Sequence, residues 1–472
     1  MSEAVQKLLE ERYYLDTENT WSDIATRVGG IYPPISRYIE EMYFIPSTPT
    51  LMNGNTGGKR KGTLSSCFIM DLEDSISGIA DAIKETMLVT KAAGGVGHTY
   101  SNLRASGETI KSINRPSSGP LPFMRMFNSV LDGVSQGGAR KGAGMAQFDI
   151  YHGDTIEAIL AKSKENHNLD RLNISLRIDD EFYTNLKHNP DSLFFCNSVT
   201  DNNTHWTVNY NNKELTYKDL WDLIIDSAWK TGDPGIFNSD IAFRQCTTTN
   251  LDKHVASNPC AEYTGIPYSS CNLGSLNATK FVKADGTFDW SLFQQVTRLA
   301  TRFLDKIIDV NDYPIEKIAD TTRKIRPIGL GCFGIAHALY MMKIPYNSEE
   351  GLEFFNTLSY TLTMTALDES ISMAEETEAY PAFDYDLFVK ANERFFDQLT
   401  VEVKDVYLAD LKKYGIRNSS LTSFAPNGTI SFIAGMLSGG IEPVYALAYS
   451  RKIEKENKTY EIVYIVDPIF EE

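Results

Sequence analysis

The chain has 472 residues, of which 42% are apolar, so it can form two or three ordinary domains or one large barrel with additions. Its formal net charge of −17 excludes a general nucleic-acid-binding surface, because such a surface needs an excess of Lys and Arg. The charged, amphipathic start is unlike a signal peptide, and the most apolar run, residues 327–342, is too short to span a membrane.

The spacing of the cysteines argues against a zinc site. No two of the six cysteines form the C-x-x-C pair that is typical of zinc sites. We therefore expect a cytoplasmic protein with reduced thiols, with no metal held by its own side chains and with no membrane or nucleic-acid partner.

The N-terminal part of the chain predicts short helices followed by a strand. We expect helices over Glu3–Leu15 and Ile35–Met42. Residues 46–64 then predict a loop, and residues 65–70 a buried strand that contains Cys67.

Asp71–Arg104 predicts a helix, a glycine turn and a strand. Apolar residues recur at helical spacing at Ile76, Ile79, Ala80, Ile83 and Met87. The turn at 92–97 lacks the G-x-G-x-x-G fingerprint of dinucleotide binding, so by itself it indicates only a tight turn.

The middle of the chain continues the alternation of strands and helices. Residues 136–146 combine small residues with two adjacent cations, and residues 163–171 form a polar loop. The expected helices are Met124–Val134, Asp154–Lys162 and Tyr217–Trp229, and the expected strands are 148–152 and Leu172–Ile178. We expect Cys196 and Cys246 to be structural.

The C-terminal part predicts long helices over Asp289–Val310, Ser348–Glu376 and Tyr385–Gly415. Between the first two, residues 326–334 predict a glycine-rich turn in which Cys332 packs. Ser423–Ser431 predicts a strand, a Pro-Asn-Gly turn and free backbone amides that can bind a phosphate. Alternating strands and helices from 65 to 450 are typical of an α/β barrel.

Residues 257–277 carry the densest chemistry. Asn258, Cys260 and Glu262 alternate, and in an extended segment their side chains would share one face. A thiol can be a nucleophile, a metal ligand, a redox partner or a radical, a carboxylate can take a proton, and an amide can orient a hydroxyl. Alone, the pattern also fits a loop with a buried Cys and a solvated Glu.

Asn-Pro-Cys-Ala-Glu followed by Ser-Cys-Asn-Leu-Gly-Ser-Leu-Asn resembles the catalytic finger loop of the large (catalytic, alpha) subunit of ribonucleotide reductase, in classes I and II. At least five motifs in the right order carry this resemblance, from about Pro46 to Pro468. It implies a ten-stranded α/β barrel of the ribonucleotide reductase and glycyl-radical type over residues 46–472, with a central finger loop near 257–271. A short helical segment, residues 1–45, precedes the barrel.

The resemblance implies reduction of ribonucleoside diphosphates to 2′-deoxyribonucleotides. Cys260 becomes a thiyl radical at the tip of an inward hairpin, Glu262 takes the 3′-hydroxyl proton, and Asn258 holds the sugar. Cys67 and Cys271 deliver two electrons and end as a disulfide. The substrate-binding positions are Thr48, Ser66, Gly95, Pro426, Asn427, Gly428, Thr429, Ile430 and Ser431.

The resemblance also implies an allosteric specificity site for dNTP or ATP with Mg²⁺. Asp74, Ser75 and Arg104 match the positions that bind the effector. Residues 115–120 and 163–171 resemble the two effector-sensing loops. Members of the family dimerise near these loops, so we expect a homodimer.

The radical source stays open between two alternatives. A separate ferritin-like metal subunit is slightly favoured by the loop sequences, and adenosylcobalamin, which needs no such subunit, is the alternative. A thioredoxin- or glutaredoxin-type reductant is implied in both. A catalytically silent nucleotide-binding regulator is a further alternative, and a thiol hydrolase is disfavoured because only His254 lies near Cys260 in sequence.

The chain departs from the family at both ends. The first motif begins by Pro46, which leaves no room for an N-terminal ATP-binding regulatory domain, so we expect a minimal form. The final strand, a tyrosine pair and a tail with two cysteines are not recognisable. We expect a minimal chain, a fragment or one part of a split protein.

Overall fold

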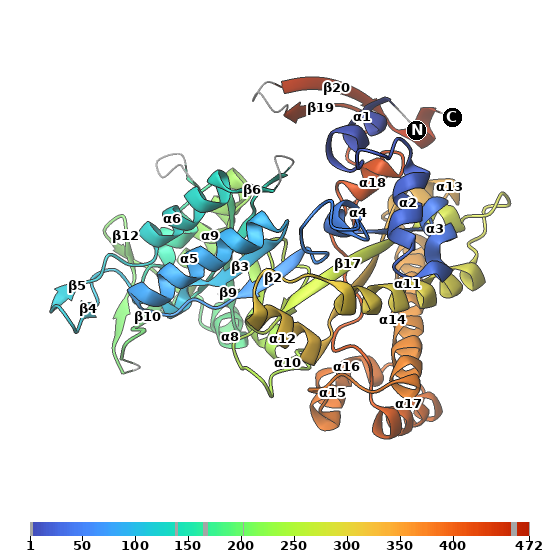
Figure 1. Cartoon of the computed structure of the whole chain (residues 1–472). Helices are drawn as coiled ribbons and strands as arrows, with labels where there is room; N and C mark the ends of the chain where they lie inside the picture. Colours follow the sequence, from blue (N-terminus) through green and yellow to red (C-terminus); the bar gives the residue numbers. More distant parts are fainter. Residues whose placement is uncertain (1–2, 137–139, 164–168, 202, 455–459, 472) are drawn as a thin grey trace. The chain divides into compact units, whose positions relative to one another are not determined.

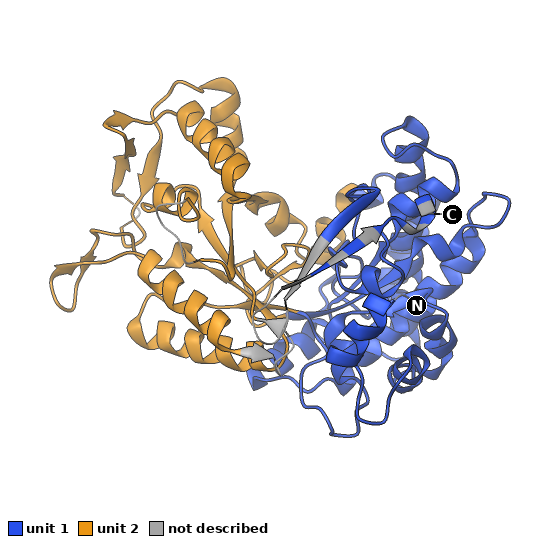
Figure 2. Cartoon of the chain, turned by 90° about the horizontal axis from the view of Figure 1, so that it is seen from above, with its two compact units in different colours: residues 1–66, 270–385, 395–472 blue, residues 67–269, 386–394 orange. Residues whose placement is uncertain are grey.

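A computed structural model describes residues 3–136, 140–163, 169–201, 203–454 and 460–471. The chain forms two compact units, coloured in Figure 2. Unit 1 comprises Met1–Ser66, Ser270–Tyr385 and Phe395–Glu472, and unit 2 comprises Cys67–Ser269 and Asp386–Arg394. The boundary predicted between residues 45 and 46 falls inside unit 1.

Unit 2 is built on a parallel sheet (Figure 1). Its strands, in spatial order, are β2 (Cys67–Met70), β3 (Gly95–Thr99), β8 (Gly144–Asp149), β9 (Leu172–Ile178) and β14 (Gly235–Asn238). Its helices include α5 (Ile76–Lys91), α6 (Leu121–Gly133), α7 (Thr155–Ile159), α8 (Asp180–His188) and α9 (Tyr217–Thr231). Alternating parallel strands and helices are the pattern predicted from the sequence.

Unit 1 is built around β17 (Ser270–Asn277), every residue of which is buried. This strand pairs antiparallel with β1 (Phe44–Pro46) and parallel with β18 (Ile328–Phe333). Its helices include α1 (Glu3–Arg12), α2 (Trp21–Gly29), α4 (Thr48–Asn53), α11 (Trp290–Val310), α13 (Ile335–Met341), α14 (Glu349–Glu376) and α17 (Val401–Tyr414). A hairpin of β19 (Ala448–Glu454) and β20 (Tyr460–Val466) and the short helix α19 (Pro468–Glu471) follow.

The predicted glycine-rich turn at 326–334 is wrong, because most of it is strand β18. A Cβ added at Gly329 would lie 2.4 Å from Leu273 Cδ2, and one at Gly331 would lie 2.2 Å from the Ser423 carbonyl oxygen. These glycines therefore let neighbouring chain segments approach closely, and they do not bend the chain. The loop predicted for residues 46–64 also contains α4, and α2 was not predicted.

Helix α5 is confirmed, but its buried face differs from the predicted stripe. The buried positions include Ile79, Ala82 and Val89, whereas Ile76 is 74% exposed and Met87 is 44% exposed. Spacing alone could not decide between these faces, because α5 has apolar residues on more than one side.

The α/β class predicted from the sequence is confirmed, and the count of ten barrel strands stays a prediction. Within the described ranges, no helix is both long and apolar enough to cross a membrane.

Candidate active site

The segment with the Asn-x-Cys-x-Glu pattern is a hairpin, as its turn residues indicate. Strand β15 (Ala256–Ser257) pairs antiparallel with β16 (Thr264–Gly265). The Asn258 N–H donates to the Tyr263 carbonyl at 3.2 Å, and the Ala261 N–H donates to the Asn258 carbonyl at 3.1 Å. Ala261 has a φ of 63°, so the tip is a tight turn and not the extended segment expected from the alternation.

The tight turn brings two of the three predicted side chains together. Asn258 Nδ2 donates to Glu262 Oε2 at 2.6 Å and to Cys67 Sγ at 3.0 Å. The Cys67 thiol lies 3.4 Å from Glu262 Oε1. The Tyr263 N–H donates to Asn258 Oδ1 at 3.0 Å, and this contact fixes which end of the amide faces the thiol and the carboxylate.

Cys260 lies at the tip of the hairpin and is exposed. The expectation of an inward-facing sulfur stays a prediction, because exposure does not say which way the sulfur faces. The turn at Ala261 separates Cys260 from the face that Asn258 and Glu262 share. An exposed thiol at a tip can be approached by a ligand from outside unit 2.

Gly95 begins β3 and lies beneath the hairpin. A Cβ added at Gly95 would lie 2.8 Å from Pro259 Cγ. Gly95 is therefore close to the residue that precedes Cys260, within the same unit.

Other predicted site residues belong to unit 1. Cys271 lies in β17 and is fully buried, and the Ser66 N–H donates to its carbonyl at 3.3 Å. Ser66 Oγ is buried and has no hydrogen-bond partner among the described residues. Thr48 begins α4, where its hydroxyl lies 3.1 Å from the Tyr13 hydroxyl.

The predicted phosphate-binding segment also lies in unit 1. Asn427 adopts a φ of 53°, and its side chain is held by Ser275 Oγ at 2.9 Å and by the Cys332 carbonyl at 3.2 Å. Helix α18 (Ile430–Ile433) follows, with Thr429 at its N-cap position. The predicted strand at its start is only an isolated bridge between Thr422 and Leu330 in the described chain.

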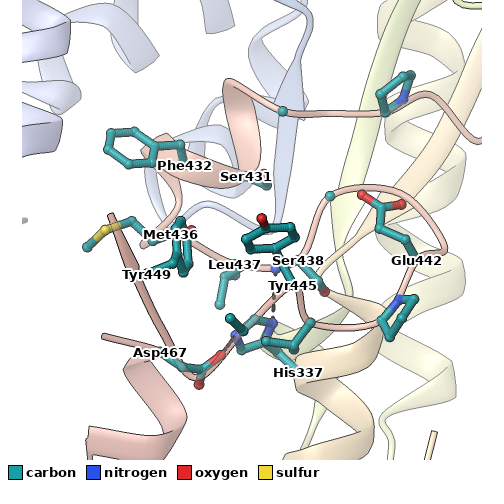
Figure 3. A pocket seen from close by; sticks show the side chains of 16 residues that line it. His337, Ser431, Phe432, Met436, Leu437, Ser438, Glu442, Tyr445, Tyr449 and Asp467 are labelled. Carbon is teal, nitrogen blue, oxygen red and sulfur yellow. Dashed lines mark hydrogen bonds and ion pairs between the residues drawn. The ribbon is translucent and has the colours of Figure 1, made fainter. Parts of the chain in front are cut away.

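This segment borders a cavity of about 210 Å³ (Figure 3). Pro426, Gly428 and Ser431 line it, together with Ser438 and Tyr445. Ser438 Oγ is buried and has no hydrogen-bond partner among the described residues. The cavity thus combines an unsatisfied hydroxyl with the residues that the sequence assigns to a phosphate.

His337 and Asp467 also line the cavity, and no motif in the sequence predicted this pair. His337 Nε2 lies 2.9 Å from Asp467 Oδ2, and His337 Nδ1 accepts from the Ser438 N–H at 2.9 Å. Burial lowers the pKa of His337, and Asp467 partly opposes this shift. Asp467 also caps α19 through the N–H groups of Ile469 and Phe470.

The three predicted effector residues lie together in unit 2. Arg104 Nε donates to Asp74 Oδ2 at 2.8 Å, and both side chains are partly exposed. Ser75 caps α5 by accepting from the Gly78 N–H at 2.9 Å. Two of the expected ligands thus pair with each other. Residues 137–139, in the segment with two adjacent cations, lie outside the described residues. The same holds for residues 164–168 of the second expected sensing loop.

The remaining cysteines are buried, as expected. Burial raises the pKa of Cys196, Cys246 and Cys332. No cluster of His, Cys, Asp and Glu that could hold a metal ion occurs in the part of the chain that the structure describes. His254 is exposed, and its Nδ1 lies 2.9 Å from Asp252 Oδ1.

Comparison with known proteins places these residues in a family context. Residues 65–471 match the model described as "Ribonucleotide reductase, barrel domain". A vitamin B12-dependent ribonucleoside-diphosphate reductase of Thermoplasma acidophilum is 37% identical, with 93% of this chain and 52% of that protein covered. A protein of the same name from Mycobacterium tuberculosis is 34% identical, with 88% and 55% covered.

A ribonucleoside-diphosphate reductase large subunit of Caenorhabditis elegans is 30% identical, with 88% of this chain and 56% of that protein covered. The chain spans about half the length of the curated relatives it matches.

Proposed function

The chain belongs to the ribonucleotide reductase family, and from this premise we propose that it is a catalytic subunit that reduces ribonucleoside diphosphates to 2′-deoxyribonucleotides. The observation that carries the proposal is the contact of Asn258 with both Glu262 and Cys67, on the hairpin that bears Cys260. A buried amide that joins a carboxylate to a thiol provides a proton acceptor and a reductant at one place.

The steps assigned to this hairpin are those of a radical reduction. Cys260, as a thiyl radical, removes the 3′-hydrogen of the ribose. Glu262 takes the 3′-hydroxyl proton, and Asn258 orients the same edge of the sugar. The 2′-hydroxyl takes a proton from the Cys67 and Cys271 pair and leaves as water. After reduction, Glu262 returns its proton to the 3′-oxygen and Cys260 returns the hydrogen to the 3′-carbon. Glu262 and Asn258 bond each other at 2.6 Å, so the sugar hydroxyl would replace part of this contact.

Cys67 and Cys271 are the proposed source of the two electrons. Each thiol loses one electron and one proton, and the pair ends as a disulfide, which a thioredoxin- or glutaredoxin-type protein reopens by thiol exchange. The bond requires the two Cα atoms to come within about 7 Å. Its formation can be checked by mass spectrometry of the peptides after one turnover without reductant.

Substrate binding is proposed for Thr48, Ser66, Gly95 and residues 426–431. Ser66 Oγ supports this role because it is a buried hydroxyl without a partner among the described residues. The cavity beside Pro426, Gly428 and Ser431 supports a diphosphate, because hydroxyls and backbone N–H groups are the donors that such an anion needs.

Adenosylcobalamin is the proposed radical source, in preference to a ferritin-like subunit. The relatives from Thermoplasma and Mycobacterium carry vitamin B12 dependence in their names, whereas the large-subunit relatives are less similar. The exposed position of Cys260 fits a bulky external cofactor, since a buried sulfur could not be reached by one. When bound, the cofactor supplies the one-electron chemistry that no ordinary side chain can start.

Regulation by dNTP or ATP with Mg²⁺ is proposed for Asp74, Ser75 and Arg104. The guanidinium of Arg104 is partly exposed and can exchange Asp74 for a phosphate. A homodimer is proposed through α5 and α6, because Ile76, Met87 and Met126 are exposed on these helices.

The test is reduction of CDP by the purified chain with adenosylcobalamin and dithiothreitol. Cys260→Ser is expected to abolish product, and Cys246→Ser, which changes a buried cysteine outside the site, is expected to keep it. Equal product from both variants would defeat the radical assignment. Effector binding without any reduction by the wild type would instead indicate a catalytically silent regulator.

A further inference from the structure

The hairpin that bears Cys260 accepts hydrogen bonds from side chains on the parallel sheet of unit 2. Three acceptors on the residues that enter the hairpin bond side chains of that sheet: the Val255 carbonyl, Ser257 Oγ and the Pro259 carbonyl. Asn258, between the last two, contacts Cys67 and Glu262 instead.

The backbone of the hairpin lies directly on β3. A Cβ added at Gly97 would lie only 1.8 Å from the Ser257 carbonyl oxygen, so only glycine fits there. The hairpin is therefore in van der Waals contact with the strand at Ser257, and a further contact is made by Gly95 with Pro259.

Gln147 and Arg177 fix the base of the hairpin. Gln147, on β8, is fully buried, and its Nε2 donates to Ser257 Oγ at 2.8 Å. Arg177, on β9, donates through Nη1 to the Val255 carbonyl at 2.7 Å and to Gln147 Oε1 at 3.0 Å. The guanidinium also lies over the ring of Phe237, 5.4 Å from its centre, which limits its movement.

Asn173 fixes the tip. It lies near the start of β9, and its Nδ2 donates to the Pro259 carbonyl at 2.8 Å. Pro259 directly precedes Cys260, so this bond acts one residue away from the proposed radical sulfur.

We propose that Asn173, with Gln147 and Arg177 behind it, is a positioning residue that sets where the Cys260 sulfur stands relative to Asn258 and Glu262. The chain reverses within a few residues at the tip, and the left-handed Ala261 follows Cys260. The bond from Asn173 ties this turn to the sheet at the residue before Cys260, and such an external anchor helps a tight turn to keep one geometry. The kinetic part of this proposal rests on the proposed function, whereas the anchoring itself does not.

The first measurement is hydrogen exchange of the peptide that covers residues 256–265. Asn173→Ala is expected to raise exchange at the Ala261 and Tyr263 amides about tenfold, because a lost hydrogen bond loosens the local fold by that order. Asn173→Asp keeps the shape but places a carboxylate against the Pro259 carbonyl, so it is expected to raise exchange more than Ala does.

Asn185→Ala is the matched control, since Asn185 also donates one side-chain amide bond, to the Tyr217 hydroxyl, on the same unit. Equal exchange in the Asn173 and Asn185 variants, or a rise spread over the whole unit, would overturn the proposal. Full protection in Asn173→Asp would also overturn it, because shape alone would then suffice.

The second measurement is CDP reduction. Asn173→Ala is expected to lower kcat about tenfold and to leave KM within about twofold, since only the reacting sulfur is misplaced. An unchanged kcat with raised exchange would overturn the link between anchoring and chemistry. If the wild type reduces no nucleotide, the proposed function fails, while the exchange result still decides the anchoring.

Discussion

The hairpin of unit 2 and the cavity of unit 1 differ in how their polar groups are satisfied. In the hairpin, Asn258 donates both amide hydrogens, to Glu262 and Cys67, and accepts from Tyr263. In the cavity, Ser438 Oγ has no partner among the described residues, and Tyr445 is 87% exposed. The proposed function assigns chemistry to the site whose groups already bond one another, and ligand uptake to the site with an unsatisfied hydroxyl.

The largest effect is expected from Glu262→Gln in the hairpin. Loss of the proposed proton acceptor should lower kcat for CDP reduction by about 10²–10⁴-fold and leave KM unchanged, because the proposal assigns the carboxylate to the reaction and not to uptake. Steady-state kinetics with product separation checks this. Glu402→Gln, an exposed change on α17, serves as the control. A raised KM with normal kcat would mean that Glu262 binds the substrate. The proposed difference between a hairpin for chemistry and a cavity for ligand uptake would then be wrong.

Low pH should have the next largest effect, on the stability of the sheet that contacts the hairpin. His98 follows Gly97 on β3 and is buried against Thr86, and burial lowers its pKa to about 3. The unfolded chain binds a proton near pH 6.5, so stability of unit 2 is complete above that pH and falls by about 1.4 kcal/mol per pH unit below it, until about pH 3.

The measurement is urea unfolding between pH 7 and pH 4, followed by exchange of the peptide that covers β3. In His98→Gln the free energy of unfolding measured at β3 should change less with pH than in the wild type, because the titrating group is gone. A slope that is identical in the wild type and in His98→Gln would assign the acid sensitivity to other groups.

Gly97→Ala should disturb the hairpin by a smaller amount. The added Cβ would meet the Ser257 carbonyl at 1.8 Å, so the strand and the hairpin must move apart, at a cost of about 1–3 kcal/mol. Chemical unfolding measures the loss. Gly133→Ala is the matched control, because a Cβ there meets nothing within 4 Å. Equal stability of the two variants would mean that the hairpin does not rest on β3.

The smallest effect is expected in the cavity. Ser431→Ala should raise the KM for CDP by up to about tenfold at unchanged kcat, because one net hydrogen bond to a phosphate contributes about 0.5–1.5 kcal/mol. Initial rates over a range of CDP concentrations test this. A lower kcat at constant KM would show that the cavity also takes part in the chemistry.

Much of the fold followed from local patterns in the sequence. Strand β9 spans the predicted residues, and α11 and α14 begin one residue after the predicted starts, Asp289 and Ser348, which are their N-caps in the structure. These elements have strong periodicity and a capping residue at the right place, and such signals act within a few residues. Where glycine served close packing, as in β18, the same local logic predicted a turn and was wrong.

The sequence by itself determined which residues carry chemistry and which secondary structure surrounds them. Only the tertiary structure decided that Asn258 contacts Cys67, 191 residues away, and that His337 contacts Asp467, 130 residues away. It also decided that the hairpin is hydrogen-bonded by Asn173, Gln147 and Arg177. The reason is physical: periodicity and caps depend on neighbours along the chain, whereas these contacts depend on the order and register of strands in a sheet.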